Sequence, residues 1–130
     1  MCIFCEIING NIPSYKVYED DDILAILDIS QTTYGHTLVM PKKHYETLLD
    51  MPDEEVSKLM VKVKQIANMI VKKTDAKGCN ILNNTNEVAG QTVMHAHVHI
   101  IPRYKDDDSV KFEFSENKID LNEVLKKIVD

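Results

Sequence analysis

Residues 95–101 read HAHVHII, so imidazole and apolar side chains occupy alternate positions. Side chains of a β-strand point to opposite faces in turn, and the alternation therefore predicts a strand over about residues 93–102. One face would carry His95, His97 and His99, and the other Ala96, Val98 and Ile100. The pattern therefore predicts a β-sheet in which this strand packs its apolar face on the core and presents the three histidines together on the other face.

Three imidazoles on one face permit two kinds of chemistry. Imidazole is a common ligand of zinc and other transition metals. It can also act as a nucleophile or a general acid–base, and phosphorus is a suitable electrophile for it. The interleaved Ala and Val argue against a histidine tag or a low-complexity metal tract, but spacing alone leaves both chemistries open. The other histidines, His36 and His44, flank a predicted strand, and surface positions are an alternative reading for each.

The clearest helix is predicted from Pro52 to about Thr74, where apolar residues recur at three- and four-residue intervals. Its acidic start and its Lys72–Lys73 end suit the helix dipole. Segments rich in β-branched and aromatic residues predict four further strands, at residues 15–20, 23–29, 35–41 and 78–84. Short helices are predicted near residues 5–10 and 120–129.

These segments predict one α+β domain over residues 1–130, with a five-stranded antiparallel sheet, one long helix and short terminal helices. The N-terminal part would span residues 1–50 and the tail residues 105–130. A hydrophobic fraction of 44% is enough for one ordinary core.

The formal net charge of -6 argues against binding of a nucleic acid polymer, which favours a basic face. A small phosphorylated ligand stays compatible, because local imidazoles and backbone amides can hold it. The start MCIFCEIINGN lacks the basic region of a signal peptide, and no segment is apolar enough to span a bilayer. We therefore expect a cytoplasmic protein without a membrane partner.

The segment CIFC places Cys2 and Cys5 two residues apart, a spacing that lets two thiolates face one metal ion. A redox-active pair is an alternative, although such pairs normally stand between a strand and a helix. Two unrelated buried cysteines are the third reading. Cys79, in an apolar strand, is expected to be an ordinary core residue.

The segment HAHVHII matches the His-x-His-x-His signature of the histidine triad (HIT) superfamily. The chain also resembles the Hint-like branch of that superfamily from CIFCEIINGNIPSYKVYEDDDILAILDISQTTYGHTLVMPKKH through NNTNEVAGQTVMHAHVHIIPRY, over roughly residues 2–105. The resemblance implies a homodimer that binds a purine nucleotide and cleaves conjugates of it at the α-phosphorus. Phosphoramidates, acyl adenylates and dinucleoside polyphosphates are the substrate classes it implies.

The resemblance also assigns roles to residues. His97 would attack phosphorus and form a nucleotidyl-histidine intermediate, His99 would contact phosphate oxygens, and His36 would support the nucleophile's ring. Asp28 would bind the ribose hydroxyls. The apolar slot for the base would be Phe4, Ile7, Ile26 and Ile29, and the polar surroundings of the phosphate would be Asn84, Gly90, Gln91 and Thr92.

Some bacterial Hint-like proteins hold a structural zinc, and the matching positions here are Cys2, Cys5, His44 and His95. Zinc would brace the fold, and no cofactor would be required for catalysis. Two other functions stay open: a purine nucleotide-binding regulatory module with incidental hydrolysis, and a metallohydrolase with a catalytic zinc on the three triad histidines.

Overall fold

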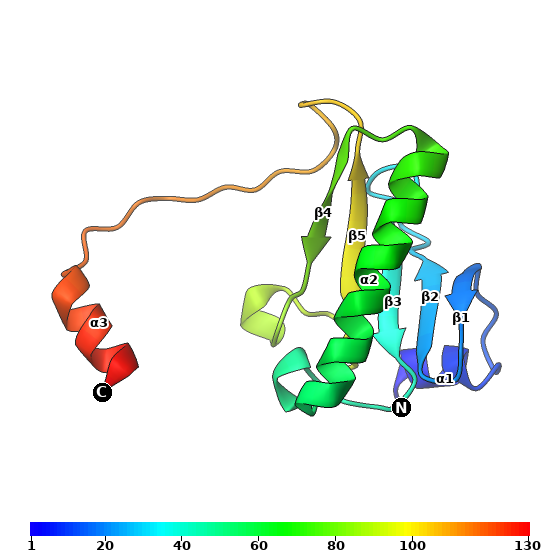
Figure 1. Ribbon diagram of the computed structural model, residues 1–130, viewed down its shortest axis with the longest axis horizontal. Helices are drawn as coiled ribbons and strands as arrows, with labels where there is room; N and C mark the ends of the chain where they lie inside the picture. Colours follow the sequence, from blue (N-terminus) through cyan, green and yellow to red (C-terminus); the bar gives the residue numbers. More distant parts are fainter.

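The computed structural model describes all residues from 1 to 130, and its centre is a five-stranded antiparallel sheet with strand order β1-β2-β3-β5-β4 (Figure 1). The strands are β1 (Lys16–Glu19), β2 (Ile23–Leu27), β3 (Thr37–Pro41), β4 (Gly78–Leu82) and β5 (Val98–Arg103). The helices are α1 (Ile3–Ile8), α2 (Asp53–Thr74) and α3 (Leu121–Val129). The α+β class, the sheet and the three helices agree with the sequence prediction.

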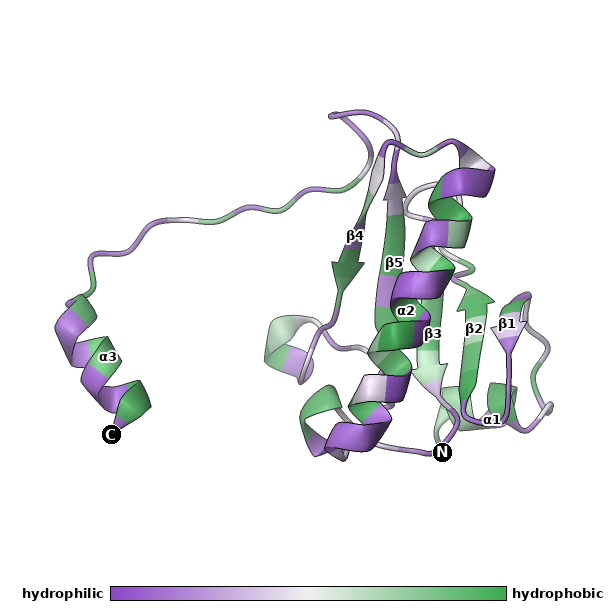
Figure 2. Ribbon diagram, in the orientation of Figure 1, coloured by the Kyte–Doolittle hydropathy of each residue, from purple (hydrophilic) through white to green (hydrophobic).

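Helix α2 crosses one face of the sheet (Figure 1). Pro52 is its N-cap, and Asp75 ends it in the left-handed conformation with φ 57°. Its apolar stripe packs on inward side chains of the strands and forms a core of twelve buried residues. The stripe consists of Leu59, Val63, Ile66, Ala67 and Ile70. Figure 2 shows polar and apolar residues alternating along α2, as expected for a helix with one buried side.

The opposite face of the sheet is covered in part by α1. A second core of five buried residues lies there: Phe4, Leu24, Ile26, Leu38 and Met40. Strands β2 and β3 are thus buried on both faces, which explains why ILAIL and TLVMP are almost uninterrupted apolar runs. The candidate site lies on this second face.

The strand predicted over residues 93–102 begins only at Val98, so the first two triad histidines precede it. Its ladder with β3 stops at the pair of Val39 and Val98. Pro41, where β3 ends, has no amide hydrogen to offer a neighbouring strand. The amide of Ala96 donates instead to the carbonyl of Tyr45 in the following loop, at 2.7 Å. The start of this strand predicted at residue 93 was therefore wrong. The actual start of β5 depends on where the neighbouring strand β3 ends, which the local sequence pattern does not show.

The tail after Lys105 runs away from the sheet and ends in α3 (Figure 1). Asp120 caps α3, accepting from the amides of Asn122 and Glu123. No residue of this helix is buried, although one of its sides is apolar. None of the helices combines the length and the apolar character required to cross a membrane.

Candidate active site and metal site

A cleft of about 300 Å³ opens on the face of the sheet that α1 covers. Of the predicted site residues, it brings together Phe4, Ile7, Ile26, Asp28, Ile29, Thr92, His97 and His99. Its remaining lining residues are Ile3, Ile12, Pro13, Ser14, Leu27, Leu38 and Val93. An apolar cleft with a few convergent polar groups is typical of a small-molecule site.

His97 is buried at the floor of this cleft with a defined proton position. Its Nδ1 lies 2.7 Å from the carbonyl oxygen of His95. A carbonyl only accepts, so Nδ1 carries the proton and Nε2 keeps a free lone pair. Burial lowers the pKa of His97, which favours the neutral ring. The edge-to-face contact with Phe4, at 5.0 Å between ring centroids, fixes the ring plane.

His36 and His99 are joined by a hydrogen bond whose donor can be assigned. The amide of Thr32 donates to Nδ1 of His36 at 3.3 Å, so His36 carries its proton on Nε2. That atom donates to Nδ1 of His99 at 2.9 Å, which leaves Nε2–H of His99 as a donor. Burial first, and then the neighbouring His97 and His36, lower the pKa of His99 to about 4. The ring is therefore neutral near pH 7.

Asp28 directly follows β2 and lines the cleft as its only acidic side chain. Its Oδ1 accepts from the amide of Ser30 at 2.8 Å, and its Oδ2 lies 3.6 Å from Nε2 of His36. The second oxygen keeps acceptor capacity, because a carboxylate offers about four lone-pair sites. A vicinal diol is a suitable partner for such a group.

Three residues predicted near the phosphate do not line the cleft. Gln91 is buried, and its side chain binds backbone groups of Glu46, Asn86 and Val93 at 2.7–2.9 Å. It therefore holds the loop that carries Thr92 into the cleft wall. Gly90 has φ 100°, a left-handed conformation that other residues rarely adopt, and it lies beside the Asn84 side chain. Contacts of Asn84, Gly90 and Gln91 with a ligand stay a prediction.

The cleft also contains residues that sequence reasoning missed. Val93 shares the parity of the triad histidines, and the alternation could have placed it on their face. Leu38 is two residues after His36, so alternation along the strand predicted at residues 35–41 could have placed both on one face. Ile12, Pro13 and Ser14 lie in the loop before β1, where no periodic pattern points to a site.

Four side chains form a separate cluster behind the cleft: Cys2, Cys5, His44 and His95. Nδ1 of His95 lies 3.5 Å from Sγ of Cys2 and 3.6 Å from Sγ of Cys5. Nδ1 of His44 lies 3.3 Å from Sγ of Cys5 and 3.2 Å from Nδ1 of His95. Zinc bonds of about 2.3 Å to sulfur and about 2.05 Å to nitrogen give tetrahedral edges of about 3.6 Å (S to N) and about 3.3 Å (N to N). The cluster therefore fits a tetrahedral zinc site.

The orientation of the ligand atoms supports the same reading. Nε2 of His95 donates to the carbonyl of Pro41 at 2.8 Å, so its Nδ1 is the unprotonated atom that faces the cluster. Burial, and then Cys2, raise the pKa of the Cys5 thiol to about 11. A bound cation would supply the charge that stabilises the thiolate. The triad histidines do not share one centre, because His97 and His99 face the cleft instead.

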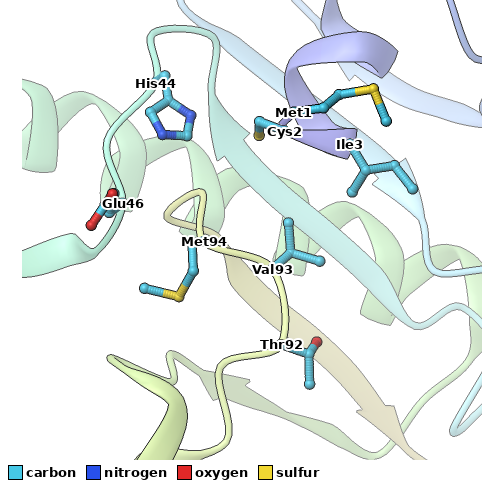
Figure 3. A pocket seen from close by; sticks show the side chains of 8 residues that line it. All are labelled: Met1, Cys2, Ile3, His44, Glu46, Thr92, Val93 and Met94. Carbon is cyan, nitrogen blue, oxygen red and sulfur yellow. The ribbon is translucent and has the colours of Figure 1, made fainter.

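A second cavity, of about 460 Å³, lies beside this cluster. Figure 3 shows Cys2 and His44 towards one end of it and Thr92 at the other. Its wall shares Ile3, Thr92 and Val93 with the cleft. The metal cluster and the cleft are thus neighbours across the start of α1.

The profile of the HIT domain family matches residues 9–106, which include the cleft strands and all three triad histidines. The chain belongs to the HIT family. An uncharacterised HIT-like protein of Methanocaldococcus jannaschii is 54% identical over 129 residues, covering 98% of both chains. An adenylylsulfatase of Arabidopsis thaliana is 46% identical over 106 residues, which are 82% of this chain and 54% of that protein.

Among solved structures, a zinc-bound histidine triad family protein of Mycobacterium smegmatis superimposes with a TM-score of 0.79. It is 39% identical, and the match covers 89% of this HIT protein and 84% of that chain. Membership of the HIT family and the adenylylsulfatase relative support hydrolase activity in general.

Proposed function

We propose that the protein hydrolyses purine nucleoside conjugates at the α-phosphorus through a covalent intermediate on His97. One observation carries the proposal: Nδ1 of His97 donates to the carbonyl of His95 at 2.7 Å, which leaves a free lone pair on Nε2 in the cleft. A neutral, fixed imidazole of this kind is an activated nucleophile that needs no deprotonation.

In the first step, Nε2 of His97 forms a bond to phosphorus and the bond to the leaving group breaks. The leaving group departs with the electron pair and takes a proton from solvent. Nε2–H of His99 donates to a phosphoryl oxygen, where negative charge develops. Water then attacks phosphorus, releases His97 and returns a proton to solvent. No step requires a metal ion.

The cleft supports a purine nucleotide as the bound half of the substrate. Phe4, Ile7 and Ile26 offer apolar walls to a flat base, and Ile29 stands at the exposed rim. Asp28 offers its free carboxylate oxygen to the ribose hydroxyls. Phosphoramidates, acyl adenylates and dinucleoside polyphosphates all share this half, so they differ only in the leaving group.

Rapid-quench analysis tests the mechanism. A radiolabelled adenosine phosphoramidate should leave a nucleotidyl adduct on wild-type protein within one turnover. His97→Ala should form no adduct and lose turnover by at least about 10³-fold, with its circular dichroism unchanged. Unchanged turnover in this variant would overturn the proposal. Saturable AMP binding without turnover on any conjugate would favour the purine nucleotide-binding regulatory module.

The substrate class can be assigned by parallel kinetics. The rate constants kcat/KM on adenosine phosphoramidate, diadenosine polyphosphate and adenylyl sulfate should differ, since only the leaving group changes. Adenylyl sulfate belongs in the comparison because a relative is an adenylylsulfatase.

We also propose that Cys2, Cys5, His44 and His95 bind zinc and that the metal braces the fold. The donor set, the interatomic distances and a zinc-bound relative support it. A tetrahedral site closed by four protein ligands has no open position for a substrate, which is typical of structural zinc.

A homodimer is the third part of the proposal. The edge strand β4 exposes Ile81, and Val88 in the loop after it is fully exposed. Helix α3 exposes an apolar side and packs on nothing in its own chain. Nine-residue helices are marginal in water, so α3 needs a surface to pack on. A second copy would supply one.

A further inference from the structure

Helix α1 carries residues of two different sites. Cys2, its N-cap, and Cys5, in its first turn, face the metal cluster. Phe4 and Ile7 line the cleft. The helix has only six residues, and a helix of that length does not hold itself together in water. Its position therefore depends on what its two sides contact.

His95 forms a second connection between the two sites. Its Nδ1 faces the two cysteines and His44, and its carbonyl oxygen accepts the Nδ1 proton of His97. The neighbouring amide of Ala96 donates to the carbonyl of Tyr45, next to His44. A metal ion that holds the two imidazoles in the cluster thus also holds the carbonyl that selects the tautomer of His97.

Phe4 lies between these two connections. Its ring makes edge contacts with His95, at 6.0 Å between centroids, and with His97, at 5.0 Å. It is buried, and it is also part of the apolar wall of the cleft. A shift of α1 would therefore move the wall for the base and the support of the nucleophile together.

We propose that metal binding at the four-ligand cluster and nucleotide binding in the cleft favour one another, with Phe4 and His95 as the positioning residues that couple them. The proposal rests on the zinc site and the nucleotide cleft of the proposed function. Metal holds α1 and the carbonyl of His95 in place, and a base packed against Phe4 and Ile7 holds the cysteines of α1 near the two imidazoles.

Coupling of this kind is reciprocal. If zinc raises AMP affinity by some factor, AMP must raise zinc affinity by the same factor. Couplings between protein sites are typically about 5- to 150-fold. We expect a factor of at least about fivefold here, because both connections converge on His97.

Calorimetric titration measures the AMP affinity of protein loaded with zinc and of protein stripped by a chelator, which gives the effect of zinc on AMP binding. Chelator competition for zinc, with and without saturating AMP, gives the effect of AMP on zinc binding. We expect the two ratios to exceed about fivefold and to agree. Equal AMP affinity in both forms would overturn the coupling while leaving the cleft assignment intact. No AMP binding in the zinc-loaded protein would overturn the proposed function, and the coupling with it.

Cysteine variants provide a matched comparison. The double variant Cys2→Ser/Cys5→Ser should bind AMP as weakly as the stripped wild-type protein and should not respond to zinc. Cys79→Ser removes the third cysteine, on β4 and outside the cluster, and should keep the wild-type response. Phe4→Leu keeps an apolar side chain without the ring edge, and zinc should change its AMP affinity by a smaller factor than in wild type. If zinc changed the AMP affinity of Phe4→Leu by the same factor as in wild type, Phe4 would have no role in the coupling.

Two spectroscopic measurements separate local coupling from general unfolding. Removal of zinc should speed amide hydrogen exchange in residues 3–8 while residues 53–74 of α2 stay protected. Long-range nitrogen-15 spectra at pH 8 should show His97 as the Nδ1–H tautomer with zinc and as a mixture without it. Loss of protection across α2, or an unchanged His97 tautomer, would overturn the role of α1 and His95.

Discussion

Nε2 of His36 lies 2.9 Å from Nδ1 of His99, and the Thr32 amide that donates to the other nitrogen of His36 decides which ring carries the shared proton. The direction of this chain makes His99 a donor towards the cleft. His36 itself does not line the cleft. Its contribution to the proposed reaction therefore passes through His99.

Replacing His36 tests this relay. His36→Ala should lower kcat by about 10- to 100-fold, taking as a guide the loss of residues that orient metal-ligating imidazoles. KM should change little, because His36 does not itself line the cleft. Steady-state kinetics on an adenosine phosphoramidate measure both constants. His36→Gln, whose amide can still donate to His99, should recover part of kcat, and a rise in KM with unchanged kcat would contradict the relay.

Asp28→Asn tests the recognition of ribose. An amide keeps the size of the side chain and an acceptor for the amide of Ser30, but it loses the charge. Hydrogen bonds to charged groups contribute about 1.5–3 kcal/mol, so AMP should bind about 10- to 150-fold more weakly. Calorimetry with AMP and 2′-deoxy-AMP should show that wild type prefers the ribonucleotide and that the variant has lost most of the preference. An equal preference in both proteins would show that Asp28 binds something else.

Local chemistry made the long helix predictable from the sequence. Pro52, the acidic first turn and the apolar stripe are all contained in α2 and its cap, and the observed helix, Asp53–Thr74, agrees with the prediction. The histidine strand was predicted less well, because its start depends on β3 and on the loop after it. The alternation still indicated correctly that His97 and His99 share a face, since both line the cleft.

The two sites needed information that no local pattern contains. Cys5 and His95 are ninety residues apart, and the spacing of the chain does not show that they meet. The amide of Gln91 holds the backbone of the loop, a contact that its place in the sequence does not reveal. The proton positions of His36 and His97 depend on a distant amide and a neighbouring carbonyl. Only the folded chain provides these contacts.

The pKa of His99 predicts how the stability of the protein depends on pH. Its pKa is about 4 in the folded protein and about 6.5 in the unfolded chain, so the unfolded state binds more protons between these values. The free energy of unfolding should therefore fall as pH decreases from about 6.5 towards 4, and His99 should have no effect above that range. Urea unfolding at pH 7.5 and pH 5.0 measures the loss. The control is His99→Gln, which keeps every other titrating group of the wild type. If its free energy of unfolding fell by as much between pH 7.5 and pH 5.0, His99 would not be the cause of the pH dependence.

The exposed apolar side of α3 predicts self-association. Light scattering after gel filtration should give a mass of twice the 14.9 kDa of one chain. Deletion of the tail from residue 106 onwards leaves the sheet and α2 intact, and it should weaken the dimer. Replacing Leu125 and Ile128, both exposed on α3, by Ser tests the same contact without a deletion. A monomer at micromolar concentration would contradict the proposed homodimer.

Zinc removal distinguishes a structural metal from a catalytic one. A ligand that binds only the folded state stabilises it by about 4 kcal/mol at a concentration of 1,000 times its Kd. A chelator should therefore lower the melting temperature clearly. The variant His44→Ala should do the same, because His44 is one of the four cluster residues and does not line the cleft. Turnover by the chelated protein, measured below its melting temperature, should stay well above that of His97→Ala. If chelation abolished turnover as completely as loss of His97 while the melting temperature stayed constant, the metal would be catalytic.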